Sequence, residues 1–458
     1  MTTSNIAADS QADIPQSKMG RLASASILAT ALEWFDFLIY STAAALVFGP
    51  LFFPGLGGAG GTIASFATLA VGFVARPLGG IIAGHLGDKY GRKGPLVGSM
   101  VVMGLATASI GLLPGYDVIG NWGAVLLIIC RLVQGLGVGA QWGGAALLLT
   151  EHAPVERRGF FGSLIQMGTI MGVVIGNAFF LIIGLFMGND EFMAWGWRIP
   201  FLSGLLLVLV GIFVQLRIED TPVFKTLQAR SAAAASTGAI QKTPLAKAVR
   251  LYWRQILQAA GAFFVVNATF YILISGMLDY GVKRVGLDKT TMLVCVLVAI
   301  STQMISIPFF GALSDRIGRR KLYLTGAVLM GLFAFPFFWM VNTGSVAVII
   351  AALIIGFTIH AVMFGPQAAL FAEMFPADVR YSGASLGFQL ASVFAGGLAP
   401  LIMTSLIAAT GQSLTVSLYI LAMAVLTWVA VYTIRERFQA NLHETSEDIR
   451  DAKAAAHV

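Results

Sequence analysis

The sequence predicts an all-α integral membrane protein, with twelve transmembrane helices arranged as two six-helix bundles. Its 458 residues are 57% hydrophobic and 11% charged, with a mean hydropathy of +0.82, whereas a soluble domain is about a quarter charged. Twelve apolar runs recur along the chain, each close to the roughly 20 residues that a helix needs to cross a bilayer. Two motifs of the first half also return, in the same order, in the second half.

The apolar runs divide the chain into two halves, because six precede a basic stretch rich in Ala and Ser and six follow it. We therefore predict a tail (1–20), an amino-terminal bundle (21–217), a linker (218–253), a carboxy-terminal bundle (254–435) and a second tail (436–458). The predicted spans are 22–48, 61–85, 95–113, 124–150, 160–187, 199–216, 255–278, 292–310, 322–341, 346–371, 382–409 and 414–434.

The basic residues predict the orientation. Of the 29 Lys and Arg residues, 23 fall in the tails and alternate loops of one side, and four fall in the loops of the other side. Short loops rich in basic residues remain in the cytoplasm. We therefore expect a multi-pass protein of a bacterial inner membrane with both termini and the linker in the cytoplasm. The charge of the linker fits a solvated loop near anionic lipid better than a nucleic-acid site.

Two loop motifs are duplicated. The loop after the second span reads GHLGDKYGRK (84–93), and the loop after the eighth span reads GALSDRIGRR (311–320). A second pair follows the fourth and tenth spans, where Glu151, Pro154 and Arg158 have the same spacing as Glu373, Pro376 and Arg380. Motifs repeated in this order predict two halves of like topology, related by an axis along the membrane normal.

This arrangement resembles the major facilitator superfamily over about residues 21–435. The resemblance implies that the motif charges latch the cytoplasmic side shut and separate as the two halves rock. In physical terms, Asp88 and Asp315 each stand beside a helix start, where backbone amides lack partners. The alternative is that these residues serve the positive-inside rule alone. The expected gate consists of Asp88, Arg92, Glu151, Arg158, Asp315, Arg319, Glu373 and Arg380.

Four ionisable residues lie deep in predicted spans of the first half: Glu33, Asp36, Arg76 and Arg131. Each costs about 2.5 to 3.5 kcal/mol on insertion scales, which makes each a functional candidate. At 1.5 Å per residue from the outer end, Glu33 and Arg76 lie at roughly 22 Å, Asp36 at about 18 Å and Arg131 at about 11 Å. We expect Glu33 to be within reach of Arg76, and Asp36 within reach of Arg131.

These four charges cancel, so the empty site is expected to be neutral. An anionic substrate would compete for a guanidinium, and desolvation would then favour the protonated form of the carboxylate that lost its cation. We expect Asp36 or Glu33 to carry the proton, and Arg76 or Arg131 to bind a substrate carboxylate. The alternative is static ion pairs between helices, although buried pairs stabilise poorly compared with apolar packing.

Uncharged polar residues extend the predicted site. The fourth span places Arg131, Gln134, Gln141 and Trp142 on one helical face, beside a stripe of Gly135, Gly139 and Gly143 that allows close helix packing. His360 is a further proton candidate because histidine titrates near neutral pH. Substrate contacts are also expected at Tyr40, Tyr271, Gln303 and Gln367, while Asn267 and Gln389 offer further hydrogen-bonding groups. Each of these groups could instead form a helix-to-helix hydrogen bond.

Shorter segments narrow the resemblance. The segments EWFDF (33–37), RPLG (76–79), WGGA (142–145) and GPQ (365–367) are similar to those of the metabolite:proton symporter family, in particular its shikimate-transporter branch. This resemblance implies proton symport of a small organic acid such as shikimate, a dicarboxylate or an aromatic acid. Many relatives carry Glu where this chain has Gln141, so a role for that carboxylate does not carry over. We expect a monomer without cofactor, metal or nucleic-acid partner.

Three other functions stay open at the level of the sequence. The first is proton symport of a zwitterion such as proline or glycine betaine, in which an aromatic or acidic group would hold the cation. An aromatic box could come from Trp34, Phe35, Phe37, Tyr40 and Trp142, although such residues in a membrane span more often serve packing. The short tail after Arg435 lacks sustained apolar heptads, which argues against an osmosensor of that kind. The second is an exporter that exchanges protons for a drug or a metabolite. The third, a membrane enzyme, fits least, because no metal-ligand cluster, phosphate loop or activated nucleophile stands out in the sequence.

Overall fold

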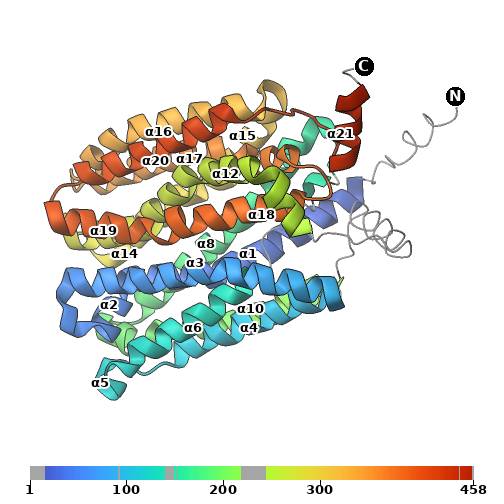
Figure 1. Cartoon of the computed structure of the whole chain (residues 1–458). Coiled ribbons are helices and arrows are strands. Elements are labelled where there is room, and N and C mark those ends of the chain that lie inside the picture. The colour runs from blue at the N-terminus through green and yellow to red at the C-terminus, as the bar shows by residue number, and fades with distance from the viewer. Residues whose placement is uncertain are drawn as a thin grey trace.

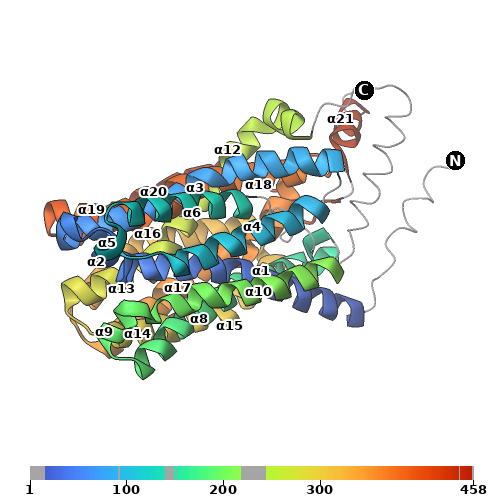
Figure 2. The ribbon, with the colours of Figure 1, turned by 90° about the horizontal axis from the view of Figure 1, so that it is seen from below.

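The computed structural model describes residues 16–90, 93–139, 149–151, 153–217, 244–442 and 444–455. Within these ranges every regular element is a helix, and the long helices lie side by side (Figures 1 and 2). The all-α prediction is therefore confirmed. Eight helical stretches of the described chain are long and apolar enough to cross a bilayer, and shorter apolar helices cover Val97–Leu112 and Trp122–Val138.

The amino-terminal half is built on six long helices. The first packs along the fifth, and the second packs along the fourth, so that each apolar run covers another. The long helices are α1 (Gln16–Leu46), α3 (Gly57–Tyr90), α4 (Lys93–Leu112), α6 (Trp122–Val138), α8 (Arg158–Phe186) and α10 (Arg198–Arg217). Short helices between them are α2 (Phe48–Phe52), η1 (Pro54–Leu56), α5 (Tyr116–Ile119), η2 (Val155–Arg157), α9 (Asn189–Glu191) and η3 (Phe192–Gly196).

The carboxy-terminal half repeats this plan, with π-helical turns in two of its spans. Such turns are rare and occur frequently at functional sites. Its first span consists of α12 (Pro244–Tyr271), η4 (Ile272–Gly276), α13 (Met277–Tyr280) and η5 (Gly281–Val285). The others are α14 (Lys289–Ser301) with α15 (Gln303–Ile317), α16 (Arg319–Val341), α17 (Val346–Met374), α18 (Arg380–Ala391) with η6 (Ser392–Gly397) and α19 (Ala399–Thr410), and α20 (Leu414–Thr433). A last short helix is α21 (Ser446–Ala455).

Helix boundaries differ from the expected ones in places. The helix α12 starts at Pro244, ahead of the predicted bundle boundary at 254, and bends at Tyr252, where φ is −123°. The predicted span 292–310 corresponds to α14 and α15, which are separated by Thr302 alone. The predicted span 382–409 is divided by η6. Apolar composition predicts that a segment is helical but carries no signal for such local changes of helical winding.

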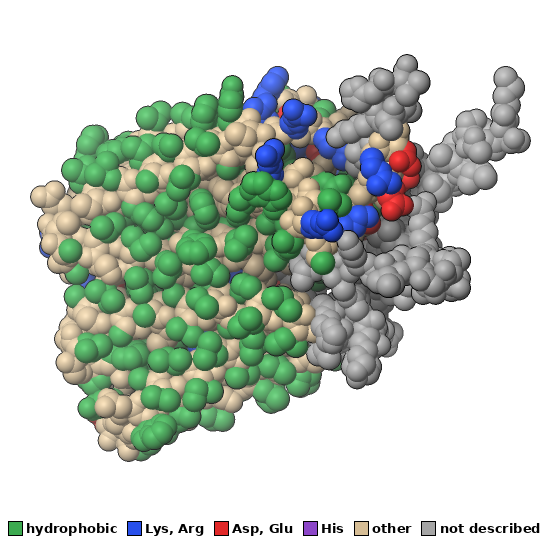
Figure 3. All heavy atoms as spheres, viewed as in Figure 1, with side chains coloured by type: hydrophobic (Ala, Val, Ile, Leu, Met, Phe, Trp, Pro, Cys, Tyr) green, Lys and Arg blue, Asp and Glu red, His purple; other side chains and the backbone are tan. Residues whose placement is uncertain are grey.

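The two halves meet through contacts between helices of each half. The helix α8 packs against α15 and α17, and α3 packs against η6 and α19. Exposed side chains over the body of the molecule are largely hydrophobic, as expected for a surface that faces lipid (Figure 3). Charged side chains gather at the end where α21 lies (Figures 1 and 3).

Candidate functional site

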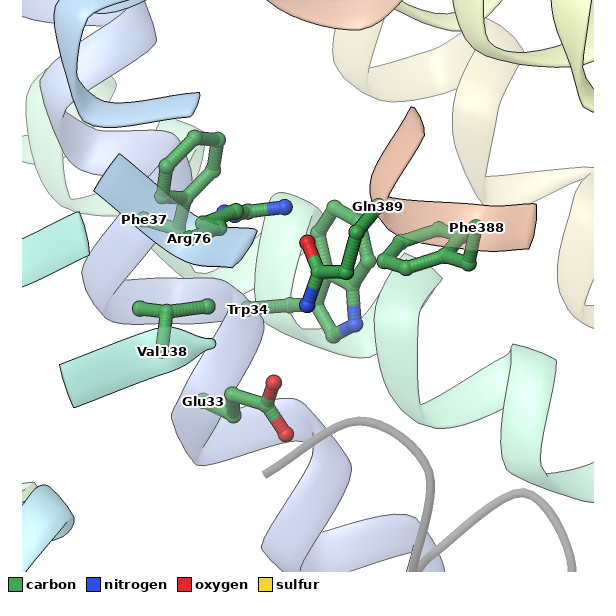
Figure 4. Close-up of a pocket in the computed structure, with 7 residues that line it drawn as sticks. All are labelled: Glu33, Trp34, Phe37, Arg76, Val138, Phe388 and Gln389. Atoms are coloured by element: carbon green, nitrogen blue, oxygen red, sulfur yellow. The ribbon is translucent and has the colours of Figure 1, made fainter. Parts of the chain in front are cut away.

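A small closed cavity lies between the two halves of the molecule. Its volume is about 10 Å³, which leaves room for one water molecule at most. In Figure 4, Arg76 from α3 and Gln389 from α18 point toward each other across the cavity, and Glu33 from α1 lies at its edge. The space between these polar groups of the two halves is therefore narrow. The lining residues are Glu33, Trp34, Phe37, Arg76, Val138, Phe388 and Gln389.

Asp36 of α1 and Arg131 of α6 do not line this cavity; Asp36 is buried inside the amino-terminal half, with 1% of its surface exposed. Gln134 of α6 donates from its amide nitrogen to Asp36 Oδ2 at 3.0 Å and to the Thr107 hydroxyl at 2.7 Å. The Gln134 carbonyl in turn accepts a hydrogen bond from Arg131 Nη1. The expected neighbours Asp36 and Arg131 are thus brought together, but through the Gln134 amide. Among the described residues no ion pair within 4 Å joins them directly.

The second carboxylate oxygen of Asp36, Oδ1, is buried and has no hydrogen-bond partner in the described part of the chain. It faces α10 at Gly204, where an added Cβ would lie 3.2 Å from this oxygen. A buried acceptor without a donor carries a free-energy cost of about 1–3 kcal/mol.

Both buried guanidiniums pack against one aromatic ring. The centroid of the Phe37 ring is 4.1 Å from Arg76 Cζ and 4.2 Å from Arg131 Cζ. Arg131 also lies 4.0 Å from the ring centroid of Tyr40, and Arg76 lies 4.4 Å from that of Phe73. Each ring face attracts a cation, and the attraction grows when both groups are desolvated. The aromatic rings therefore stabilise two arginines that have no ion pair among the described residues.

Several guanidinium N–H groups lack acceptors. Arg131 Nε and Nη2 and Arg76 Nε are buried and have no hydrogen-bond partner in the structure as described. Arg131 is 0% exposed and Arg76 is 2% exposed. Buried polar groups are nearly always hydrogen-bonded, and exceptions of this kind indicate a ligand, a water molecule or stored strain.

Glycines bring these arginines close together. An added Cβ at Gly135 would lie 2.2 Å from the Gly72 carbonyl oxygen, and one at Gly139 would lie 2.0 Å from the Arg76 carbonyl oxygen. The predicted close approach at Gly135 and Gly139 of α6 is therefore confirmed, and α3 is the helix that packs there. Since α3 carries Arg76 and α6 carries Arg131, this contact sets the distance between the two cations.

Gly72 also leaves space for Arg131 itself, because an added Cβ would lie 2.5 Å from Arg131 Nε. We predict that Gly72→Ala displaces this side chain and lowers uptake at least tenfold, as misplacement of a binding group by about 1 Å can cost about a hundredfold. The initial rate at which vesicles take up the transported substrate measures this fall. Gly98→Ala is the matched control, because an added Cβ there meets nothing within 4 Å. Equal uptake by both variants would contradict the prediction.

Glu33 and Arg76 line the same cavity and interact electrostatically, although no ion pair within 4 Å joins these two described residues. Their expected proximity is thus observed without direct contact. The cavity also contains Gln389, whose buried Oε1 has no partner in the described chain. Gln389 was expected only as a general hydrogen-bonding group. Phe37 was expected only as part of an aromatic box for the cation of a zwitterion, and Phe388 was not expected at all, since aromatic residues on a membrane helix give no sequence signal that separates lining from packing.

In the carboxy-terminal half, outside the lining of this cavity, His360 of α17 accepts a hydrogen bond at Nδ1 from the Gln303 amide nitrogen, 2.9 Å away. The same nitrogen donates to the Phe357 carbonyl at 2.8 Å, which identifies it as the amide NH₂ and leaves the imidazole proton on Nε2. His360 Nε2 and Gln303 Oε1 are both buried without a hydrogen-bond partner in the described structure. The ring of His360 lies 5.8 Å from Phe270.

Tyr271 of the carboxy-terminal half packs against aromatic rings of the amino-terminal half. It ends α12 immediately before the π turn η4, and its ring contacts Phe73 edge-to-face at 5.4 Å and Phe37 at 6.3 Å. Its buried hydroxyl has no partner among the described residues. Of the polar residues expected from the carboxy-terminal half, Tyr271 is therefore the one placed against the rings that hold the arginines.

Two expected substrate residues are already satisfied by other contacts. The Tyr40 hydroxyl bonds to Thr68 at 2.5 Å. Gln367 accepts from Gln166 of α8 at 3.1 Å and donates to the Tyr323 hydroxyl at 2.9 Å. Gln367 thus joins the two halves in this state. Gln141, Trp142, Arg92 and the side chain of Asp88 lie outside the described residues.

The gate residues of the two repeats pair across the halves. Arg158 Nη1 lies 3.4 Å from Glu373 Oε1, and Arg380 Nη1 lies 3.0 Å from Glu151 Oε1. In the structure Arg158 and Arg380 therefore each bond the carboxylate of the other repeat, and not the carboxylate of their own repeat. The physical reason is the repeat axis, which places equivalent helix ends opposite each other. Arg319 joins the network at 3.4 Å from Glu373.

Asp315 completes the gate at the start of α8. It accepts hydrogen bonds from the amides of Gly159 at 2.8 Å and Phe160 at 2.9 Å, and its Oδ1 lies 2.7 Å from Arg319 Nη1. The expectation that this carboxylate lies beside a helix start with unpaired amides is confirmed, and that helix belongs to the other half. Such a position is favourable for an anion because of the helix dipole and the free N–H groups.

The segment after α20 lies across this gate, a feature that the sequence did not indicate. The carbonyl of Ala440 accepts from Arg158 Nη1 at 3.0 Å, and that of Leu442 accepts from Arg380 Nη2 at 2.8 Å. Leu442 is buried against Ala372 of α17. The tail thus contributes acceptors to gate arginines from both halves.

Comparison with known proteins agrees with this architecture. The family profile described as "Sugar (and other) transporter" matches residues 22–448. The chain belongs to this transporter family. The match covers both halves and the segment across the gate. The twelve-span fold and the resemblance to the major facilitator superfamily are therefore confirmed.

Curated relatives of this transporter family cover nearly the whole chain. The inner membrane metabolite transport protein YhjE of Escherichia coli K12 is 37% identical over 92% of this chain and 95% of its own length. The shikimate transporter of the same strain is 38% identical over 89% and 92%. A proline/betaine transporter, again of that strain, is 34% identical over 96% and 89%. These relatives are named as transporters, so the chain is a multi-pass membrane transporter rather than an enzyme.

Solved structures of the family share the fold. The D-xylose-proton symporter superposes with a TM-score of 0.70 over 92% of this chain and 98% of its own, at 16% sequence identity. The major facilitator superfamily symporter XylE, bound to 6-bromo-6-deoxy-D-glucose, gives a TM-score of 0.72 over 94% and 99%, at 17% identity. At this level of identity the likeness concerns the fold alone.

Proposed function

We propose that this transporter is a proton symporter that imports a small organic acid by alternating access. The observation that supports it best is the set of buried guanidinium N–H groups on Arg76 and Arg131 that lack acceptors. A carboxylate is the acceptor that matches a guanidinium in geometry and charge. Both arginines are held by aromatic rings, so either side chain is available to an anion without first breaking an ion pair.

Proton coupling would follow from charge balance. The four central charges, Glu33, Asp36, Arg76 and Arg131, sum to zero, and an entering anion adds one negative charge in a region of low dielectric constant. Arg131 would turn toward the substrate and release Gln134, which in turn would release Asp36. A proton on the open Oδ1 of Asp36 would restore neutrality. Substrate and proton would thus be loaded together, with Asp36 as the proposed proton carrier.

The polar groups of the other half would recognise the rest of the substrate. His360, with its imidazole proton on Nε2, and Tyr271 each offer a donor, while Gln303 and Gln389 each offer a carbonyl oxygen. A hydroxylated acid such as shikimate presents both donors and acceptors to such groups. The shikimate transporter among the relatives supports this choice over a purely apolar acid. The cavity of about 10 Å³ would have to widen as the halves rock apart.

Transport measurements in proteoliposomes would test the proposal. Uptake of labelled shikimate, a dicarboxylate, benzoate and glycine betaine is compared with and without an inward proton gradient. We expect gradient-driven accumulation of at least one of the acids. Uptake that does not depend on the inward proton gradient would contradict the symport proposal. A further arm imposes an outward proton gradient, and accumulation driven only by that gradient would identify an exporter that exchanges protons for substrate.

The second candidate function is symport of a zwitterion such as proline or betaine. Trp34, Phe37 and Phe388 line the cavity and could surround a quaternary ammonium group, while an arginine holds the carboxylate. The proline/betaine transporter among the relatives keeps this candidate open. Selective accumulation of glycine betaine in the same assay would favour it over the organic acid.

The proposed gate role concerns the cluster of Arg158, Arg319 and Glu373. We predict that Glu373→Gln weakens the contacts across the halves and opens the cytoplasmic side, because one neutral side chain replaces the carboxylate that faces two cations. The reporter is a cysteine at Ser163, which faces Gly311 across the two halves, in a chain whose native cysteines are replaced. We expect its labelling in inside-out vesicles to become several-fold faster.

Glu444→Gln is the control for the gate. Glu444 forms a half-exposed ion pair with Arg437 of the same tail, and this pair does not join the two halves. Its labelling rate should match that of the parent protein. Unchanged labelling in Glu373→Gln would show that the cluster does not hold this side shut.

The proposed orientation places both termini and the linker in the cytoplasm of a bacterial cell, with the protein in the inner membrane. The gathering of charged side chains at the α21 end supports it, since basic residues mark the cytoplasmic side (Figure 3). The relatives include a protein named for the inner membrane. We also propose that one chain suffices for transport, because both walls of the cavity come from the same chain.

A further inference from the structure

A second cavity lies at the opposite end of the carboxy-terminal half from α21. Its volume is about 580 Å³, far larger than the closed central cavity. It is bounded by the end of α16, the start of α20, η5 and the turn after α19. Residues of this lining include Tyr280, Arg284, Trp339, Asn342, Gln412 and Leu414. None of them belongs to the transport site described above, so the cavity needs an explanation of its own.

The charge of this cavity is positive. Arg284 is the cation of the lining, which contains no carboxylate. Its Nη2 donates to the Gly411 carbonyl at 2.6 Å, in a turn where Gly411 has a φ of +68°. Among the described residues Arg284 has no ion pair, although its neighbour Lys283 pairs with Asp279 at 2.8 Å. A guanidinium has five N–H donors, so several remain for an anion inside the cavity.

Other polar groups of the lining are already arranged by hydrogen bonds. The Tyr280 hydroxyl donates to Asn342 Oδ1 at 2.6 Å, and Asn342 Nδ2 donates to the Ser413 hydroxyl at 3.2 Å. This chain of hydrogen bonds ties the end of α13 to the loop after α16 and to the loop before α20. The cavity is therefore a built feature of the fold, in which three separate segments hold the wall around Arg284.

Two exposed apolar stripes lead into the cavity. On α16 the stripe runs from Val328 through Leu332 to Trp339, which are 46%, 64% and 69% exposed. On α20 it begins at Leu414 and continues through Leu418, which are 48% and 50% exposed. The two helices pack together, and one end of each stripe, Trp339 or Leu414, lies in the lining of the cavity. From Val328 to Trp339 the stripe is about 16 Å long at 1.5 Å per residue, close to one leaflet of a core roughly 30 Å thick.

From this juxtaposition we infer that the cavity is a binding site for a phospholipid, with the headgroup phosphate on Arg284 and the acyl chains along the α16 and α20 stripes. Trp339 stands where the stripe of α16 reaches the cavity, and tryptophan prefers the boundary between headgroups and acyl chains. A guanidinium matches a phosphate in geometry and charge. The site would prefer a net anionic headgroup, since no carboxylate of the lining repels it.

A soluble phosphate or a small organic anion would satisfy Arg284 alone. It would leave the stripes unused, and these stripes are what distinguish this cavity from an ordinary surface arginine. The apolar stripes would therefore bind the acyl chains of a lipid, and Arg284 would make the site prefer an anionic headgroup. The two parts can be tested separately.

The test uses the full-length protein reconstituted with brominated lipids, which quench nearby tryptophans. The Trp339 signal is the difference between the parent and Trp339→Phe, in vesicles of phosphatidylcholine with added dibromo-phosphatidylglycerol or dibromo-phosphatidylcholine. We expect quenching of Trp339 at a lower fraction of the anionic lipid. Arg284→Gln should remove this preference, which is roughly fivefold for one basic side chain near a membrane surface.

Arg254→Gln is the matched control, because Arg254 lies against the exposed Trp253 at the other end of the same half, with 5.3 Å from its Cζ to the ring centroid. It should leave the Trp339 signal unchanged. Equal quenching by the two brominated lipids in the parent protein would overturn the anionic preference. Loss of the preference on adding inorganic phosphate at constant ionic strength would overturn the lipid and identify a soluble anion. Uptake by Arg284→Gln confirms that this variant is folded.

Discussion

Asp36→Asn is expected to abolish concentrative uptake while leaving exchange of substrate across the membrane within about tenfold of the parent rate. Asparagine has the shape of the protonated carboxyl group and still offers an oxygen to Gln134, so the variant resembles the loaded, protonated state. Binding can proceed, but no proton can be released to drive the cycle. Proteoliposomes loaded with unlabelled substrate measure exchange, and an inward proton gradient measures accumulation.

The control for Asp36 is Glu33→Gln, which neutralises the other central carboxylate. If Asp36 alone carries the proton, the Glu33 variant keeps a gradient-dependent uptake, although its affinity for substrate changes. Accumulation by Asp36→Asn would contradict the assignment and leave Glu33 or His360 as the carrier. A loss of both exchange and accumulation would show that Asp36 is needed for folding or binding.

The second large effect is expected at Arg131. Arg131→Lys keeps a positive charge but loses the planar group that packs on Phe37 and Tyr40 and donates to Gln134. Lysine can pair with the substrate carboxylate as a point charge but cannot form the two parallel hydrogen bonds of a guanidinium, and one hydrogen bond to a charged group contributes about 1.5–3 kcal/mol. We therefore expect the apparent affinity to fall by roughly tenfold to a hundredfold, since each 1.4 kcal/mol corresponds to about tenfold.

Binding of labelled substrate at equilibrium measures this loss without the transport cycle. Arg198→Lys is the control, because Arg198 donates to the carbonyls of Gly111 at 2.9 Å and Leu113 at 2.6 Å, outside the central cavity. Its substrate affinity should remain that of the parent. If Arg131→Lys binds substrate with unchanged affinity, the arginine holds helices together, and Arg76 becomes the candidate for the substrate carboxylate.

The central charges could be predicted as neighbours because depth along a membrane helix follows from residue number at a fixed rise. Their contacts could not. Gln134 stands between Arg131 and Asp36, three residues from one and 98 from the other along the chain. The placement of Phe37 between two guanidiniums is likewise invisible in a sequence rich in aromatic residues. Gly72 gives no signal of its own, because its role is the space it leaves for Arg131.

The gate illustrates the same limit. The duplicated motifs predicted which charges belong together, and the structure shows that partners are exchanged between the repeats, as in Arg380 with Glu151. A sequence repeat specifies equivalent positions but contains no information on whether they face each other. The sequence of the tail gave no indication of its contacts with the arginines, because Ala440 and Leu442 bind them through backbone carbonyls, which every residue has.

The sequence by itself determined the fold class, the two halves and the identity of the buried charges. These properties follow from the cost of placing polar groups in hydrocarbon, which acts on each residue according to its type and position along the chain. The tertiary structure alone decided which groups touch. Contacts such as Gln134 with Asp36 depend on how helices distant in sequence pack, and that packing is settled by side-chain shape and by the glycines that let α3 and α6 approach.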